Sequence, residues 1–154
     1  MKKVLIFVLA AAVLMLSACS QAPAKEVVLK DVMSGLAEKY GLEEGMLILT
    51  ADDLMELYGI AAADVKQFEA RMQMESLMAD EVVLIEAVDA QAAARVKEKL
   101  EGRYQSKLNE TRDYLPDEFA KIEKSKVSVN GNYVALIVTG EAEAAQADYE
   151  KALK

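Results

Sequence analysis

This 154-residue chain has a single cysteine, at position 19, which lies just after an apolar segment near the amino terminus. It follows a start with two lysines, Lys2 and Lys3, and an apolar run of 13 residues from Val4 to Leu16. A helix of that length is too short to cross a bilayer core of roughly 30 Å. The run closes on small residues, as signal peptides do before their cleavage site. Residues 1–18 therefore predict a secretory signal peptide that takes no part in the fold.

The residues Leu16-Ser17-Ala18-Cys19 resemble the lipobox of bacterial lipoproteins. In that pattern the chain is cut between Ala18 and Cys19, and the cysteine becomes the lipidated first residue. An odd cysteine in an exported protein needs an explanation, and acylation of Cys19 supplies one. The alternative is an ordinary secretory signal with an incidental cysteine. We therefore expect a protein on the extracytoplasmic face of the cell membrane, held there by a lipid at Cys19.

Removing 18 of the 154 residues leaves 136, a length that suits one domain. We expect residues 19–26 to be the lipidated cysteine and a short tether, and residues 27–154 to form a single α+β globular domain. The seven residues after Cys19 reach only about 23 Å when fully extended, so the domain is expected to stay close to the bilayer. Because no second cysteine exists, the fold must rest on packing without a disulfide.

Charge and missing residue types exclude several classes of function. Without Lys2 and Lys3 the chain keeps 16 basic and 26 acidic residues, a formal net charge of −10. Phosphate backbones and anionic head groups repel such a surface, so we expect no nucleic-acid partner and contact with the membrane only through the lipid. Histidine is absent, which removes the commonest general base and metal ligand. We expect no catalytic residues, no bound metal and no cofactor.

Apolar residues spaced three and four positions apart predict amphipathic helices. Thr50 and Asp89 are placed to cap the second and third of them, and Gly41 and Gly59 to end the first two. Gly102 interrupts the longest helix, where either a packing contact or a slight bend would explain it. The helices are expected over residues 29–40, 51–58, 90–113, 117–123 and 141–153.

Period-two alternation from Phe68 to Glu75 predicts a strand with one buried face, and the apolar run Val82 to Val88 predicts a central strand. Residues 126–129 and 133–139 flank Asn130-Gly131-Asn132, a strong hairpin signal. Residues 46–49 form a brief apolar stretch with an extended conformation as one option. The sum is an α+β domain with an antiparallel sheet of about four strands in two hairpins, packed with helices, one of them long and lying between the hairpins.

The two most apolar strands raise the question of what covers the sheet. Residues 82–88 and 133–138 are apolar on both faces, whereas a sheet with helices on one side should alternate. Either helices cover both faces, or part of one face is exposed and meets another protein. We favour helices on both faces because enough helices are predicted.

Two residue groups have a chemical interpretation and a simpler structural one. Methionines could bind a soft metal, but Met72 and Met74 are expected on the buried face of a strand beside Phe68, where methionine fills space. Paired acidic residues could bind calcium or act as acid and base, but they lack the spacing of an EF-hand loop, and we expect them to be solvated or to cap helices. These pairs are Glu43-Glu44, Asp52-Asp53, Asp80-Glu81 and Asp117-Glu118.

Residues 80–139 resemble the domain-of-unknown-function family numbered 4358, small lipoproteins of low-GC Gram-positive bacteria. The matching pieces are Asp80-Glu81-Val82-Val83-Leu84-Ile85, Asp89, the long helix with Arg103, Tyr114-x-Pro116 and Gly131-Asn132-Tyr133-Val134. The resemblance implies an envelope lipoprotein and brings no catalytic residues. Its best-matched segments make Arg103, Tyr114 and Tyr133 the candidates for specific binding contacts.

Arg103 has Lys99 and Lys107 four residues away on either side and no acid at helical spacing, so its own helix offers it no ion pair. It is therefore either solvated, paired with a carboxylate from another segment, or part of a binding site. These observations favour a non-enzymatic lipoprotein that binds an envelope protein or another envelope component. The alternatives are a small-molecule-binding lipoprotein that serves a transporter and, less favoured, a small envelope enzyme.

Overall fold

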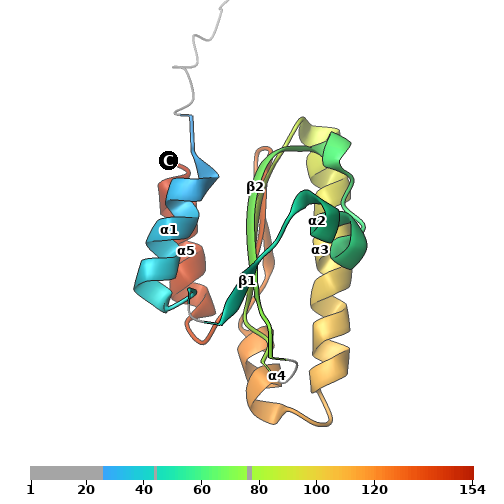
Figure 1. The fold of residues 1–154 in the computed structure, drawn as a ribbon, viewed down its shortest axis with the longest axis vertical. Coiled ribbons are helices and arrows are strands. Elements are labelled where there is room, and N and C mark those ends of the chain that lie inside the picture. The colour runs from blue at the N-terminus through green and yellow to red at the C-terminus, as the bar shows by residue number, and fades with distance from the viewer. Residues whose placement is uncertain (1–25, 44, 76–77) are drawn as a thin grey trace, which may run out of the picture.

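The computed structural model describes residues 26–43, 45–75 and 78–154, which fold into three layers (Figure 1). A five-stranded sheet is the middle layer, and helices lie against both of its faces. The predicted signal peptide, its cleavage site at Ala18 and Cys19, and nearly all of the tether lie outside the described residues. None of the helices in the described part of the chain has the length and apolarity needed to cross a membrane.

The sheet is antiparallel throughout and runs in the order β1-β2-β3-β5-β4. Two hairpins, β2-β3 and β4-β5, join through the pairing of β3 with β5, which confirms the predicted α+β architecture. The additional strand is β1, which was too short to show a periodicity and which pairs with β2 at one edge. The strands are β1 Met46–Ile48, β2 Val65–Gln73, β3 Glu81–Ala87, β4 Val127–Asn130 and β5 Tyr133–Val138.

Helices cover both faces of the sheet, as favoured from the apolar character of its central strands. On one face Val83, Ile85 and Leu136 pack with the helices α2, α3 and α4. On the other face Val82, Leu84 and Ile137 pack with α1 and α5. Every residue of β3 is buried as a result. The helices are α1 Leu29–Tyr40, α2 Ala51–Tyr58, α3 Ala90–Thr111, α4 Pro116–Glu123 and α5 Ala142–Ala152.

Local sequence signals set the ends of these helices. The Thr50 side chain accepts a hydrogen bond from the Asp53 backbone while the Asp53 carboxylate accepts one from the Thr50 backbone, so the two residues form a capping box at the start of α2. Asp89 caps α3 by accepting a hydrogen bond from the Ala92 N–H at 2.8 Å. Gly41 and Gly59 end α1 and α2 with φ of +67°, which glycine adopts without a steric cost.

The methionine prediction was wrong for Met74. Strand β2 ends at Gln73, so Met74 lies beyond the sheet and its side chain is 72% exposed. Met72 is partly buried against the core on the face that carries α3. A period-two pattern does not show where a strand stops, because the alternation of residue types continues into the connection.

Replacing Leu84 by alanine tests the two-sided core. Leu84 is fully buried in the central strand between the sheet and the α1 and α5 helices, so Leu84→Ala should cost about 2–5 kcal/mol of unfolding free energy. Leu47→Ala is the control, because Leu47 lies in the edge strand β1 and is 43% exposed; it should cost less than about 1 kcal/mol. Urea denaturation of the full chain measures both. Equal losses would contradict the assignment of Leu84 to the core.

Candidate functional site

A charged side chain, Glu81, lies at the start of the central strand and is fully buried. Its position in β3 places it on the same face as Val83 and Ile85, which is the face that α3 covers. In the sheet Glu81 is paired with Met72 of β2 on one side and Val138 of β5 on the other. A carboxylate in such apolar surroundings requires charged partners, since an unpaired buried charge is very costly.

Two cations from α3 supply that pairing. Arg103 donates from Nη2 to Glu81 Oε2 at 2.8 Å and from Nε to both carboxylate oxygens at 3.2 Å. The ammonium of Lys107 lies 3.0 Å from the same Oε2. Arg103 and Lys107 are one helical turn apart, so both face the sheet together. The expectation that Asp80-Glu81 is solvated or caps a helix is therefore wrong for Glu81.

The pairing keeps Glu81 ionised. Burial alone would raise the pKa of its carboxyl, but the hydrogen bonds from Arg103 and the positive charges of Lys107 and Arg103 lower that pKa below its ordinary value. An ionised carboxylate with both oxygens engaged has little capacity to take up a proton. Glu81 therefore lacks the property that a general acid or base needs.

Helices α3 and α4 hold the two residues before Glu81, Ala79 and Asp80, through polar contacts. Lys107 donates to the Ala79 carbonyl oxygen at 3.0 Å, and the Ala79 N–H donates to Glu118 of α4 at 2.7 Å. Lys121, also of α4, donates to Asp80 at 2.5 Å and lies 2.9 Å from Glu118. Polar contacts from α3 and α4 thus fix three successive residues at the point where the chain enters β3.

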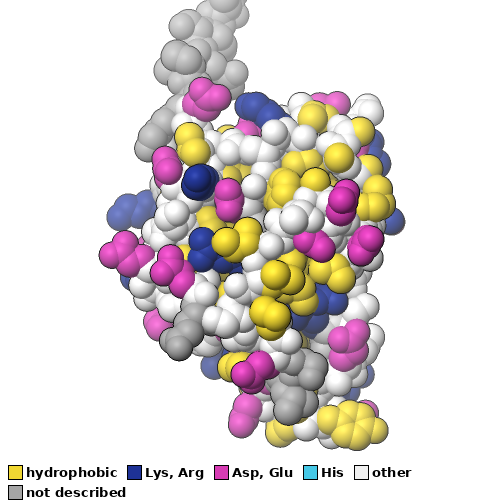
Figure 2. Space-filling view, viewed as in Figure 1, with side chains coloured by type: hydrophobic (Ala, Val, Ile, Leu, Met, Phe, Trp, Pro, Cys, Tyr) yellow, Lys and Arg dark blue, Asp and Glu magenta, His cyan; other side chains and the backbone are white. Residues whose placement is uncertain are grey.

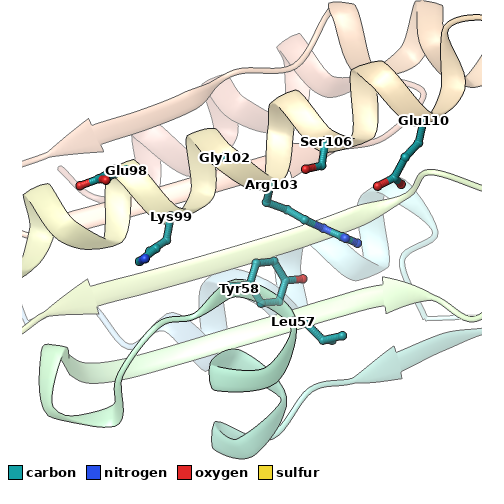
Figure 3. A pocket seen from close by; sticks show the side chains of 8 residues that line it. All are labelled: Leu57, Tyr58, Glu98, Lys99, Gly102, Arg103, Ser106 and Glu110. Atoms are coloured by element: carbon teal, nitrogen blue, oxygen red, sulfur yellow. The ribbon is translucent and has the colours of Figure 1, made fainter.

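Beside this cluster lies an open cleft of about 440 Å³ between the end of α2 and the middle of α3. Figure 3 shows Arg103 reaching from α3 over the ring of Tyr58, which comes from α2. The guanidinium carbon is 5.6 Å from the ring centroid, a cation-π distance. The cleft is lined by Leu57, Tyr58, Glu98, Lys99, Gly102, Arg103, Ser106 and Glu110.

Tyr58 and Gly102 are two of the residues that line the cleft. Tyr58 is buried, and its hydroxyl has no hydrogen-bond partner within the described residues. Burial and the charge of Glu81 raise the pKa of this hydroxyl, so it stays a donor. At Gly102 an added Cβ would have no atom within 4 Å, so no packing contact explains this glycine. Its missing side chain leaves the middle of α3 open toward the cleft.

The side chains that line the cleft are polar or charged for the most part. The cleft presents cationic and hydroxyl donors from Lys99, Arg103, Ser106 and Tyr58, together with carboxylates from Glu98 and Glu110. Across residues 26–43, 45–75 and 78–154, no group of three or more carboxylates converges in a way that could hold a metal ion. The side chains of the cleft can therefore hold a polar ligand in place.

The structure separates the three residues singled out from the sequence. Arg103 faces the sheet and pairs with a carboxylate from another segment, which was one of the alternatives considered for it. Tyr133 lies on the opposite face, paired in register with Glu86. Tyr114 is 84% exposed in the turn between α3 and α4. These three residues do not form a common site.

Glu81 and Lys107 were missed, although the sequence carries a signal for them. The buried stripe of α3 runs through Val96 and Leu100 and continues, at helical spacing, into Arg103 and Lys107. Basic residues on the apolar stripe of a helix need an inward-facing acid, and Glu81 has the same strand parity as Val83. Together, the helical periodicity of α3 and the alternation of β3 would have predicted that Arg103 and Lys107 pair with Glu81.

A second polar cluster fixes the start of the domain on the opposite face. Gln67 of β2 accepts a hydrogen bond from the Leu29 N–H at 3.0 Å and donates to the Val27 carbonyl oxygen at 2.7 Å. Its amide also donates to Glu86 at 2.5 Å, and Lys66 donates to the same carboxylate at 2.8 Å. This cluster attaches the first turn of α1 to the sheet.

Substituting Glu81 by glutamine tests the buried ion cluster. Glu81→Gln keeps the shape but leaves Arg103 and Lys107 without a counter-charge, so it should cost about 3–5 kcal/mol of unfolding free energy at neutral pH. Because the pKa of Glu81 is lowered by folding from its ordinary value of 4.5, its contribution is complete above about that pH and is lost as the pH falls through the folded value. The difference between the two proteins should therefore shrink on acidification.

Urea denaturation at a series of pH values measures this difference. Glu56→Gln, at an exposed position of α2, is the control and should change the unfolding free energy by less than about 0.5 kcal/mol. A difference between wild type and Glu81→Gln that stays constant from pH 7 to pH 3 would show that Glu81 is not the group whose ionisation matters.

Comparison with known proteins adds one family. No curated protein matches this chain, and no solved structure matches it. A family described as Domain of unknown function (DUF4358) matches residues 38–139, which are 102 of the 154 residues. The match begins well before the segment recognised from the sequence, and it includes Tyr58, Glu81, Arg103 and Lys107 but none of α5. The chain belongs to the family of the domain of unknown function DUF4358.

Proposed function

We propose that this protein is an extracytoplasmic lipoprotein, anchored to the membrane through Cys19, whose domain binds another envelope component and does not catalyse a reaction. The anchor is supported by the sequence alone: a charged start, a short apolar run and the residues Leu16-Ser17-Ala18-Cys19. Residue 26 begins the described fold, so only a short segment separates the proposed lipid from the domain.

The state of Glu81 is the observation that carries the binding role. It is the fully buried carboxylate beside the cleft, and its oxygens are already occupied by Arg103 and Lys107. An acid–base catalyst needs a group that exchanges protons near the working pH, whereas the pKa of Glu81 is lowered. Glu81 therefore acts as a structural partner that holds Arg103 in place at the edge of the cleft, which supports a binding role.

One experiment in intact cells tests both parts of the proposal. The full chain, labelled with palmitate and treated with a short crosslinker, should fractionate with membranes, carry label and join reproducibly to a neighbouring envelope component identified by mass spectrometry. Cys19→Ala should lose the label and most of the membrane association, because Cys19 is the single cysteine of the sequence and its sulfur is the proposed site of lipid attachment. It should also lose the crosslinked neighbour, since the domain is no longer held near it.

Ser20→Ala is the matched control and should behave as wild type, because it changes the residue next to the proposed lipid without removing the thiol. Equal membrane association and labelling of Cys19→Ala would refute the anchor. Efficient anchoring with no reproducible crosslink in repeated experiments would refute the binding role.

A second candidate function is the binding of a small solute for delivery to a transporter. The cleft of about 440 Å³ favours it, because this volume suits a small molecule. Lys99 and Arg103 line it together with Glu98 and Glu110, so the fitting ligand carries both charges, as a zwitterionic amino acid does.

Thermal unfolding with the amino acids, tested one at a time, examines this candidate. A true ligand should raise the melting temperature of the full chain with the logarithm of its concentration above Kd, by several degrees at about 100 times its Kd. Gly102→Leu should abolish the rise by filling the cleft. Gly35→Leu is the control, because Gly35 also has open space around it but lies in α1 on the other side of the sheet. The absence of any concentration-dependent rise with all of the amino acids would remove this function.

A further inference from the structure

The outer edge of β1 is open for pairing. In the β1-β2 ladder Leu49 donates to the Ala70 carbonyl oxygen at 2.9 Å, and Met74 donates to Gly45 at 3.3 Å. Since hydrogen-bonded pairs alternate in an antiparallel ladder, Met46 and Ile48 direct their N–H and C=O groups away from β2. Among the residues that the structure describes, none bonds to these outward groups.

This edge is also apolar on both faces. Leu47 lies opposite Met72 on the face of α3 and is 43% exposed, while Ile48 lies opposite Arg71 on the other face and is 63% exposed. Figure 2 shows apolar side chains gathered over β1 and α2, where Met55 and Leu57 are exposed as well. An incoming strand would therefore find apolar neighbours for its side chains on either side of the sheet.

The opposite edge of the sheet is built differently. Strand β4 carries Ser128 and Asn130, follows Lys126, and is covered in part by Gln146 of α5, whose amide donates to Ser128 at 2.8 Å. Polar residues, lysines and covering helices are the usual protection of an edge strand against further pairing. Strand β1 contains no charged, polar or proline residue. The contrast identifies β1 as the edge that is left open.

Charges at the two ends of β1 define the partner. Glu43 and Glu75 lie at one end, since Met74 is bonded to Gly45, and Asp52 and Glu56 follow at the other end in α2; all four are exposed. The nearest cation by register, Arg71, directs its Nη1 to the Leu42 carbonyl oxygen at 3.1 Å. An apolar segment with basic residues at both ends would match this edge.

A second copy of the chain would not match it. If two β1 strands paired antiparallel about a two-fold axis, Glu43 of one copy would approach Asp52 of the other, and like charges opposed in this way repel. The formal net charge of −10 that is expected once residues 1–18 are removed adds to that repulsion. The occupant is therefore a different protein.

We infer that β1 binds an extended, basic-flanked apolar segment of a partner protein, which adds as a sixth strand to the edge of the sheet. This inference rests on the proposed binding role and names the surface and the kind of partner for it. Backbone hydrogen bonds to Met46 and Ile48 hold the segment, Leu47 and Ile48 contact its side chains, and its lysines or arginines lie beside Glu43 and Asp52.

A synthetic peptide tests the surface directly. The probe has an alternating valine–threonine centre, two lysines at each end and a fluorescent label, and its binding to the full chain is followed by fluorescence anisotropy. Ile48→Pro removes an outward N–H that β2 does not use, so it should weaken binding at least about tenfold. Val129→Pro, at an exposed position of the opposite edge strand, is the matched control and should leave binding unchanged.

Charge is tested without relying on a proline. A peptide with glutamates in place of the lysines should bind at least about tenfold more weakly to the wild-type chain. The double variant Glu43→Lys with Asp52→Lys should bind the basic peptide more weakly and the acidic peptide more tightly than the wild-type chain does. Circular dichroism and urea denaturation confirm that each variant is folded.

Four outcomes would overturn the inference: unchanged binding to Ile48→Pro, equal binding of the two peptides, no binding of the basic peptide, or a dimer of the chain that Ile48→Pro dissociates. In cells, a crosslinked neighbour that persists with Ile48→Pro would refute β1 as the surface and leave the proposed binding role standing. If Ile48→Pro loses that neighbour in cells and also binds the basic peptide weakly, the result would support both the β1 surface and the proposed binding role.

Discussion

The buried Glu81 carboxylate constrains much of this structure. A charge at the start of the central strand is tolerable only because Arg103 and Lys107 reach it from one face of α3. That requirement fixes the rotation and the height of a 22-residue helix against the sheet. It also draws in Ala79 and, through Glu118 and Lys121, the position of α4. Hydrophobic packing favours contact between these layers, and the ion cluster favours one particular alignment.

The alignment has a consequence for the surface. Because Arg103 is turned inward over Tyr58, and because Gly102 has no side chain, the middle of α3 borders a cleft instead of a filled ridge. Within the sheet, Leu47 of β1, Met72 of β2 and Glu81 of β3 form one cross-strand row. The open edge is thus two strands from the buried ion cluster at Glu81. A binding edge gains from such support, since an ordered strand loses little entropy on pairing.

Local signals allowed most of the fold to be predicted. The stops at Gly41 and Gly59, the cap at Asp89 and the turn at Gly131 each depend on a few adjacent residues, and the structure has them where the sequence indicated. Features that depend on pairing between distant segments were not predictable in the same way. Three-residue β1 is a strand only because β2 is beside it, and Glu81 is buried only because α3 brings two cations. The three candidate residues were all chosen from the resemblance; the missing helical partner of Arg103 agreed with its pairing to Glu81, whereas Tyr114 and Tyr133 lie apart from it.

Gln67 joins the start of α1 to the sheet. This single side chain receives the Leu29 N–H, donates to the Val27 carbonyl oxygen and is itself fixed by Glu86. Tension applied through the preceding residues would therefore pass from Val27 straight into the sheet, bypassing the rest of α1. Force on Val27 would thus be shared between β2, through Gln67, and β3, through Glu86, before it reached the later turns of α1.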